Sequence, residues 1–500
     1  MKRRWKILIG VIVIMLGFAA FWFVPKWGAV VAYRRMLLRQ GEKLEIAEVL
    51  PPPVPPNQNG ADTVLAAFRL LNNANDNISN LVPAMRLILP GKAIVCFKQP
   101  EVRDEEFTNS WSNEMAVEED ARPVRELLIK ASRYPAIDFH LNYGDEMEML
   151  LTNLSPLREC ERRLVTGAVC SLHQDDDATA ATNICVILAL VNEERDERVA
   201  LSQLVRMGMA SDAACANWEL LQSTNVNDLE LATLQQSWER LEFLQSAENA
   251  IQMERACAEA TIKRMRGSPE YFNHAATMGI RGPSNIWDNA KLTGTRLTWR
   301  FLWSYPDELL GLKGEQAILE ALRSAQTNRS FYSSYTNMSA QLTALGIPDW
   351  GEEAYLLMDI DLPHLFSDDV PELASLLYRS TVEEATKRMV VTAIALKWYQ
   401  LKNAKYPATL SDLTPEFLSS VPLDPVDGQP LRYRLKADGK FLLYSIGFNG
   451  KDDGGNPAGE KETAYDDYFW PTPHSLDWVW PQPSTPEEIN NYYAHPAKEN

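Results

Sequence analysis

The sequence opens with a basic cluster and a long uncharged run, which together constrain the fold more than any other feature. Residues 2–6 carry four basic side chains, and the eighteen residues from Ile7 to Val24 carry no charge. A helix of that length spans roughly 27 Å at about 1.5 Å per residue, close to the apolar thickness of a bilayer. We therefore predict that residues 1–28 hold a transmembrane helix, with residues 7–24 in contact with membrane lipid.

This run can be a retained anchor or a signal peptide that is removed. Signal peptidase prefers small residues at positions −3 and −1, and cleavage after Ala20 would place Phe18 at −3. We therefore predict a retained signal-anchor. The basic residues before the run favour a cytoplasmic N-terminus. The expected location is the inner membrane, with a single crossing and the bulk of the chain in the periplasm.

The charge of the remaining chain excludes one class of partner. Residues 44–500 carry 40 basic and 66 acidic side chains, which gives a net charge of −26. A surface with this surplus repels phosphate backbones, so no nucleic-acid partner is expected. Binding of cations or of a basic protein remains open.

The body of the chain is predicted to be mainly helical. Residues 29–60 are predicted to form a juxtamembrane helix and a proline-rich linker, because prolines at 51–53, 55 and 56 favour a stiff extended segment. Residues 61–71 and about 117–266 show repeated apolar spacing of three and four residues, typical of amphipathic helices. Glycines, prolines and tryptophans interrupt this spacing in residues 267–350, where 315–326 is the clearest helix, and we assign this stretch to the same domain. We predict an antiparallel helical domain over 61–370.

Residues with reactive or metal-binding chemistry do not gather into a known motif in this sequence. The six cysteines fall at irregular spacing without C-x-x-C, and most lie in helical sequence, which favours small buried apolar residues. The six histidines show no pair at ligand spacing. No nucleophile elbow, zinc-protease helix, phosphate loop or dinucleotide fingerprint occurs in a suitable context. The sequence therefore predicts no catalytic residue.

The C-terminal region has a different pattern, which predicts one helix packed on a small antiparallel sheet over residues 375–470. Ser380 with Glu383 and Thr381 with Glu384 form two overlapping capping boxes, which predict that a helix starts there. Alternating residues from Leu431 are followed by an Asp-Gly turn at 438–439 and an apolar strand from Phe441, as in a β-hairpin.

Three motifs within this region occur in a distinctive order: Lys405-Tyr406-Pro407-x-x-Leu410-x-x-Leu413, Val421-Pro422-x-Asp424-Pro425-x-x-Gly428-x-Pro430-Leu431-x-Tyr433, and Tyr444-Ser445-x-Gly447-x-Asn449-Gly450-x-x-x-Gly454-Gly455. In order and spacing they resemble the globular half of the G-type major pseudopilin of type II secretion systems, over residues 380–470. The whole layout resembles large envelope proteins of planctomycete and verrucomicrobial type. This resemblance implies a role in secretion or cell-envelope assembly.

The resemblance also implies calcium binding by the last loop. The expected ligands are Asn449, Asp452, Asp453, Asp466 and Asp467. Family members usually have aspartate where this chain has Asn449, so one negative ligand is missing and a lower calcium affinity is expected. The chain also lacks the prepilin cleavage motif with which the family begins. From the residues alone, a solvated turn rich in Asn, Asp and Gly is the alternative to a metal site.

The sequence therefore leaves two functional hypotheses. The first is a non-enzymatic, membrane-anchored envelope protein of structural or interaction type, with a pseudopilin-like α+β module and a calcium-binding loop. The second is a periplasmic hydrolase or polymer-binding protein that uses two facing carboxylates in a pocket of the helical domain. The tail over 471–500, rich in Pro and Trp, either packs on the module or presents an extended recognition segment; we predict packing.

Overall fold

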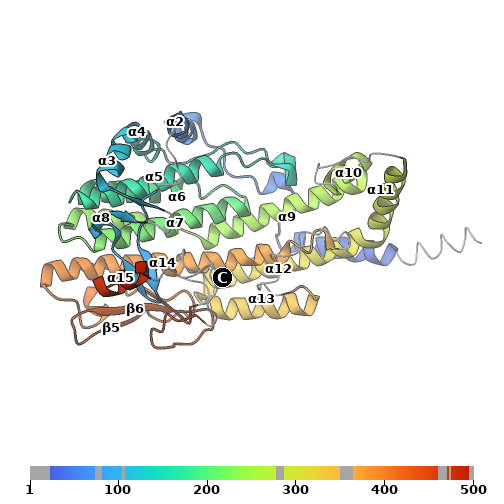
Figure 1. The fold of residues 1–500 in the computed structure, drawn as a ribbon. Helices are drawn as coiled ribbons and strands as arrows, with labels where there is room; N and C mark the ends of the chain where they lie inside the picture. Colours follow the sequence, from blue (N-terminus) through green and yellow to red (C-terminus); the bar gives the residue numbers. More distant parts are fainter. Residues whose placement is uncertain are drawn as a thin grey trace, which may run out of the picture.

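The protein is built from long helices in layers, with a small sheet at one end (Figure 1). The structure is a computed structural model, and it describes residues 23–73, 81–103, 107–276, 286–348, 364–459, 470–471 and 475–494. The predicted mainly helical body is confirmed.

The prediction of a transmembrane helix requires correction. Within the ranges that the structure describes, no helix combines the length and apolar character needed to cross a bilayer. The predicted span over residues 7–24 lies outside the described residues except for its last two positions. Residues 23–39 are helical, and Leu37 of this helix packs with Leu44 and Leu312 of the body. The signal-anchor and the single-pass inner-membrane location are corrected with it, and the lipid contact of residues 7–24 stays a prediction.

The first helical layers follow the predicted periodicity closely. The core positions of α2 to α8 recur every three to four residues and meet in one large apolar cluster, in which α5 packs on α6 and α7. The buried apolar residues of α9 belong to three other clusters, one of them shared with α12. The N-cap of α8 is Asn227, which forms a capping box with Glu230. The helices are α2 (Ala61–Asn73), α3 (Trp111–Asp120), α4 (Arg122–Ala131), α5 (Leu154–His173), α6 (Asp177–Glu193), α7 (Ala200–Leu221), α8 (Asp228–Glu239) and α9 (Leu244–Gly267).

The remaining helices complete the elongated body. α12 packs on α9, α13 and α14. Short helical turns, η1 to η4 and η8, lie in the connections. The elements are α10 (Pro269–Ala276), α11 (Ile286–Thr298), the π-helix η5 (Trp299–Trp303), α12 (Ser304–Asn328), α13 (Phe331–Leu345), η1 (Ile46–Glu48), η2 (Pro56–Gln58), η3 (Cys96–Lys98), η4 (Tyr143–Glu148) and η8 (Leu410–Leu413).

Helix α14 (Val370–Asn403) joins the helical body to the C-terminal module as one continuous element of 34 residues. The predicted start at Ser380 is wrong: the Ser380 hydroxyl donates to the Leu376 carbonyl, and Thr381 donates to Leu377, inside the helix. The helix begins where Pro371 occupies the first turn, a position that tolerates the missing N–H. Buried contacts with α7 and α8 along its length hold the helix in place.

The sheet of the module lies against α14. Strand β6 (Phe441–Ile446) is buried throughout and pairs antiparallel with β5 (Arg432–Leu435) on one side and β7 (Asp477–Val479) on the other. The hairpin turn predicted at Asp438-Gly439 is present, with Gly439 at a φ of 79°. The expected helix and antiparallel hairpin are therefore found, with a third strand from the tail.

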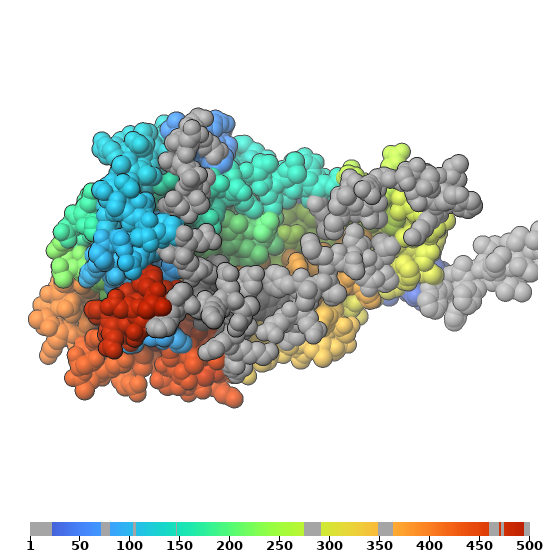
Figure 2. Space-filling model, in the orientation of Figure 1, coloured from blue at the N-terminus to red at the C-terminus, as the bar shows by residue number. Residues whose placement is uncertain are grey.

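The tail packs on the rest of the chain, as predicted. Strand β8 (Gln482–Pro483) runs parallel to β2 (Lys92–Ile94), which pairs with β1 (Arg86–Leu89). The Trp218 indole N–H donates to the Pro481 carbonyl at 2.9 Å. Helix α15 (Pro486–Ala494) follows, seen in red beside the light-blue residues around position 100 in Figure 2. Two short strands, β3 (Val102–Arg103) and β4 (Thr108–Asn109), form a separate hairpin.

Candidate functional site

The loop after β6 contains the residues predicted to bind calcium, and close contacts fix its path. A Cβ at Gly447 would lie 2.2 Å from the Leu476 carbonyl oxygen, so only glycine fits there. Gly450, Gly454 and Gly455 have φ between 68° and 80°, a left-handed conformation that favours glycine. The three glycines turn the chain back over the outer face of the sheet.

A buried carboxylate on β7 organises the loop. Asp477 is fully buried and accepts hydrogen bonds from the backbone N–H groups of Gly455 at 2.8 Å, Asn456 at 3.0 Å and Asp453 at 3.3 Å. Burial raises the pKa of Asp477, against the effect of these donors. Three orphan amides of the loop are thus satisfied by a side chain of the sheet.

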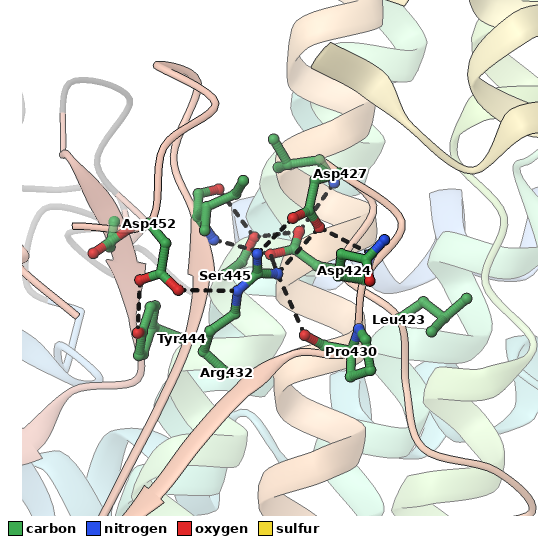
Figure 3. Close-up of polar contacts among 12 residues, drawn as sticks. Leu423, Asp424, Asp427, Pro430, Arg432, Tyr444, Ser445 and Asp452 are labelled. Atoms are coloured by element: carbon green, nitrogen blue, oxygen red, sulfur yellow. Dashed lines mark hydrogen bonds and ion pairs between the residues drawn. The ribbon is translucent and has the colours of Figure 1, made fainter. Parts of the chain in front are cut away.

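Arg432 and Asp424 form the centre of a second polar cluster beside this loop (Figure 3). The Arg432 guanidinium forms ion pairs with Asp424 at 3.2 Å, with Asp427, and with Asp452 at 3.5 Å. Asp424 also accepts from the Ser445 hydroxyl at 2.7 Å and from the Ile446 and Val426 backbone amides, both at 2.9 Å. The cluster joins the 424–430 turn, β5, β6 and the loop.

Burial and charge shift the acidic groups of this cluster in opposite directions. Burial raises the pKa of Asp424 to about 6, although its hydrogen bonds favour the ionised form. Burial also acts to raise the pKa of Asp452, but the Gly454 amide, the Tyr444 hydroxyl and Arg432 outweigh it and lower the pKa. The pKa of Asp427 is lowered in the same way, because the hydrogen bond from Arg432 and its charge outweigh burial. Arg432 therefore pairs with two carboxylates whose pKa values are lowered, Asp427 and Asp452, and with one whose pKa is raised, Asp424.

The structure brings only some of the predicted calcium ligands together. The Asn449 amide donates to Asp453 at 2.7 Å, whereas Asp452 faces Tyr444 and Arg432. Asp466 and Asp467 lie outside the described residues. Calcium needs six to eight oxygen ligands, and in the described ranges no group of three acidic, His or Cys side chains could hold a metal ion. The described residues alone do not fit a calcium shell, and calcium stays a prediction.

Sequence reasoning missed the residues that organise this site. Asp424 and Ser445 stand within the motifs of the resemblance, but those motifs do not reveal that the two side chains meet. The alternation along β5 places Arg432 on the face opposite to Leu431 and Tyr433, but it does not indicate which carboxylates this side chain contacts. Asp477 lies in the tail, and no local signal indicates that the tail returns to pair with β6.

A second candidate lies in the helical body, where two carboxyl groups face each other. Arg158 bridges them, at 2.8 Å from Glu161 and at 2.8 Å from Asp212. The two carboxyl groups are within hydrogen-bond reach, and burial raises the pKa of both. Close carboxyl groups share a proton and titrate as a pair.

This pair meets only part of what the hydrolase hypothesis requires. Asp212 lines a cavity of about 220 Å³ between α5, α7 and the 81–87 segment, but Glu161 is fully buried behind it. A general acid or base must reach the substrate within hydrogen-bond distance. A polymer also needs a longer groove than this cavity offers. The arrangement favours binding of a small molecule over hydrolysis.

Comparisons with family models, with curated proteins and with solved structures found no match for this chain.

Proposed function

We propose that this chain is a non-enzymatic interaction protein whose C-terminal module docks a partner protein through the edge of strand β5. The partner contributes an acidic, extended segment that adds to the sheet. The resemblance to pseudopilins suggests that this partner belongs to secretion or cell-envelope assembly. The observation that carries the proposal is the exposed, basic edge of β5.

Strand β5 supports docking because half of its backbone groups face away from the sheet. In the described residues β5 pairs with β6 alone. Lys436 donates to Lys440 across the hairpin, so even-numbered residues of β5 bond to β6 and odd-numbered residues point outward. The Leu431 amide is taken by Pro422, which leaves the amides of Tyr433 and Leu435 for an added strand.

Charge defines the kind of segment that fits. Arg434, Lys436 and Lys440 are exposed around this edge, in a chain whose net charge is −18. A groove of about 400 Å³ runs along the strand and is lined by Arg432, Arg434 and Tyr444 among others. Basic side chains on an edge strand discourage pairing with other strand edges. An incoming strand therefore needs carboxylates that balance these charges.

The rest of the module serves as a rigid base for this edge. Tyr433 is fixed by a hydrogen bond from its hydroxyl to the Pro407 carbonyl at 2.7 Å and by stacking on Phe441. Arg432 is held by its three carboxylates, so the strand is ordered before a partner arrives. Preorganisation of this kind reduces the entropy lost on binding.

The test is quantitative co-purification with crosslinking of the full-length chain from its native cells. We expect amine crosslinks from Lys436 and Lys440 to one partner protein, and we expect the double variant Arg434→Glu/Lys436→Glu to lose that partner. Lys405→Glu is the matched control, because Lys405 is also exposed but lies before the sheet. Leu435→Pro removes one outward amide without breaking the β5–β6 ladder and should give the same loss.

Equal recovery of the partner with the charge-reversal variant and with the Lys405→Glu control would refute docking at β5. Circular dichroism of the variants separates this outcome from unfolding. If the variants are folded and the unaltered chain enriches no protein over the charge-reversal variant, the proposal that this chain is an interaction protein fails.

A further inference from the structure

The cavity beside Asp212 is built from residues that are far apart in the sequence. Helix α5 contributes Arg162, Val165 and Thr166, and α7 contributes Asp212 and Cys215, in each case from one face of the helix. The 81–87 segment and Tyr492 of α15 complete the wall. Closure of the cavity therefore depends on the return of the tail.

Two observations mark this cavity as more than a packing defect. Thr166 lines the cavity, and its buried hydroxyl has no hydrogen-bond partner among the described residues. Buried hydroxyl groups are almost always paired, and an unpaired one costs free energy. Arg162 also lines the cavity and forms no ion pair or hydrogen bond within the described part of the chain.

The balance of charge around the cavity favours an anion. Arg158 holds both Glu161 and Asp212 at 2.8 Å, so this trio is neutral when the two acids share one proton. Arg162 then adds a positive charge at the wall. Arg86 also lines the cavity, where its guanidinium donates to the Tyr492 hydroxyl at 3.3 Å and lies 5.8 Å from the centroid of the Tyr492 ring.

We propose that this cavity binds a small organic carboxylate. Arg162 pairs with the carboxylate group, and the Thr166 hydroxyl donates a hydrogen bond to it. Val82, Pro83 and Val165 contact the apolar part of the ligand. The volume of about 220 Å³ is below the roughly 300–1,000 Å³ of sites for drug-sized ligands, so the ligand is a small molecule. The proposal is independent of docking at β5.

The test uses benzoate and benzamidine, which share a ring but carry opposite charge. Binding to the full chain is measured by ligand-observed NMR and isothermal titration. We expect benzoate to bind and benzamidine not to bind. Arg162→Gln should weaken benzoate binding by about tenfold or more, the loss expected for one charge-assisted hydrogen bond. Thr166→Val, which keeps the side-chain shape, should weaken it further in the double variant.

Arg133→Gln is the matched control, because Arg133 is exposed and lies away from the cavity. The side chain of Arg162 is also exposed, so loss of binding in Arg162→Gln with an unchanged melting temperature supports the proposal. Preference for benzamidine, absence of benzoate binding up to millimolar concentration, or equal binding by Arg162→Gln and Arg133→Gln would each overturn it.

Discussion

Asp424 lies at the centre of the polar cluster in the C-terminal module (Figure 3). Its two oxygens accept from two backbone amides, one hydroxyl and the Arg432 guanidinium, and it is fully buried. A buried carboxylate with this many donors positions several segments at once, since the donors belong to the 424–430 turn, to β5 and to β6. The cluster therefore holds the 424–430 turn against β6.

We predict that Asp424→Asn destabilises the protein by about 1–3 kcal/mol, because the amide N–H group of asparagine faces a donor that then loses its acceptor, while Arg432 keeps its ion pairs with Asp427 and Asp452. Asp427→Asn is the control, since Asp427 pairs with the same guanidinium but its side chain is 24% exposed. We expect its cost to be about 1 kcal/mol or less. Urea unfolding measures both; equal losses would contradict the central role of Asp424.

At the scale of elements, α12 and α14 approach each other closely at a glycine. A Cβ at Gly314 would lie 2.6 Å from Cγ1 of Val370 and 3.1 Å from Cδ1 of Ile347. We predict that Gly314→Ala destabilises the protein, because an overpacking cost of about 1–3 kcal/mol exceeds the gain in helix propensity of about 1 kcal/mol.

Gly294→Ala is the matched control for that substitution. Gly294 also lies inside a helix, but a Cβ there would meet no atom of the described residues within 4 Å. The substitution should therefore stabilise the protein by up to about 1 kcal/mol. Thermal and urea unfolding of both variants test the close approach, and a stabilising Gly314→Ala would exclude it.

The loop after β6 provides the test of the calcium prediction. Asp452 and Asp453 lie in this loop, and Asp466 and Asp467 complete the expected ligand set with Asn449. We expect millimolar calcium to raise the melting temperature of the full chain by several degrees over that in chelator, because a ligand that binds the native state stabilises it, and we expect Asp453→Asn to abolish this rise. Equal melting temperatures in calcium and in chelator would contradict the calcium prediction.

Elements with strong local periodicity could be predicted from the sequence, whereas those set by distant contacts could not. The helices from α4 to α9 and the β5–β6 hairpin follow apolar spacing and turn residues. The sequence misplaces the start of α14 because capping boxes are local signals, and burial of Val370 and Leu377 extends the helix past them. Asp477 and β7 depend on the return of the tail, for which the sequence carries no local pattern.

At the scale of the whole molecule, the helical body buries several carboxyl groups that form no ion pair within the described residues. Burial raises the pKa values of Glu193, Glu315 and Glu383 to about 8 each. Glu383 accepts from the Ser211 hydroxyl at 2.6 Å with one oxygen, and its other oxygen has no partner among the described residues. These groups favour the protonated state inside the fold, since ionisation without a partner in a dry interior is costly.

We therefore predict that the protein is more stable at pH 5.5 than at pH 8.5. In the unfolded chain these glutamates ionise near pH 4.5, whereas in the fold they stay protonated up to about pH 8. Between these values unfolding releases protons, so stability is fully present below the unfolded pKa and falls as pH rises through the folded one. Burial acts to raise the pKa of Glu42, but Arg323 and Arg255 outweigh it and lower this pKa to about 2. Glu42 therefore changes the stability only below the range from pH 5.5 to pH 8.5.

Melting temperatures at pH 5.5 and pH 8.5 should differ by about 5 °C or more. Glu383→Gln should reduce that difference, whereas the exposed control Glu126→Gln should leave it unchanged. Equal melting temperatures at the two pH values would show that these carboxyl groups reach water in the native state.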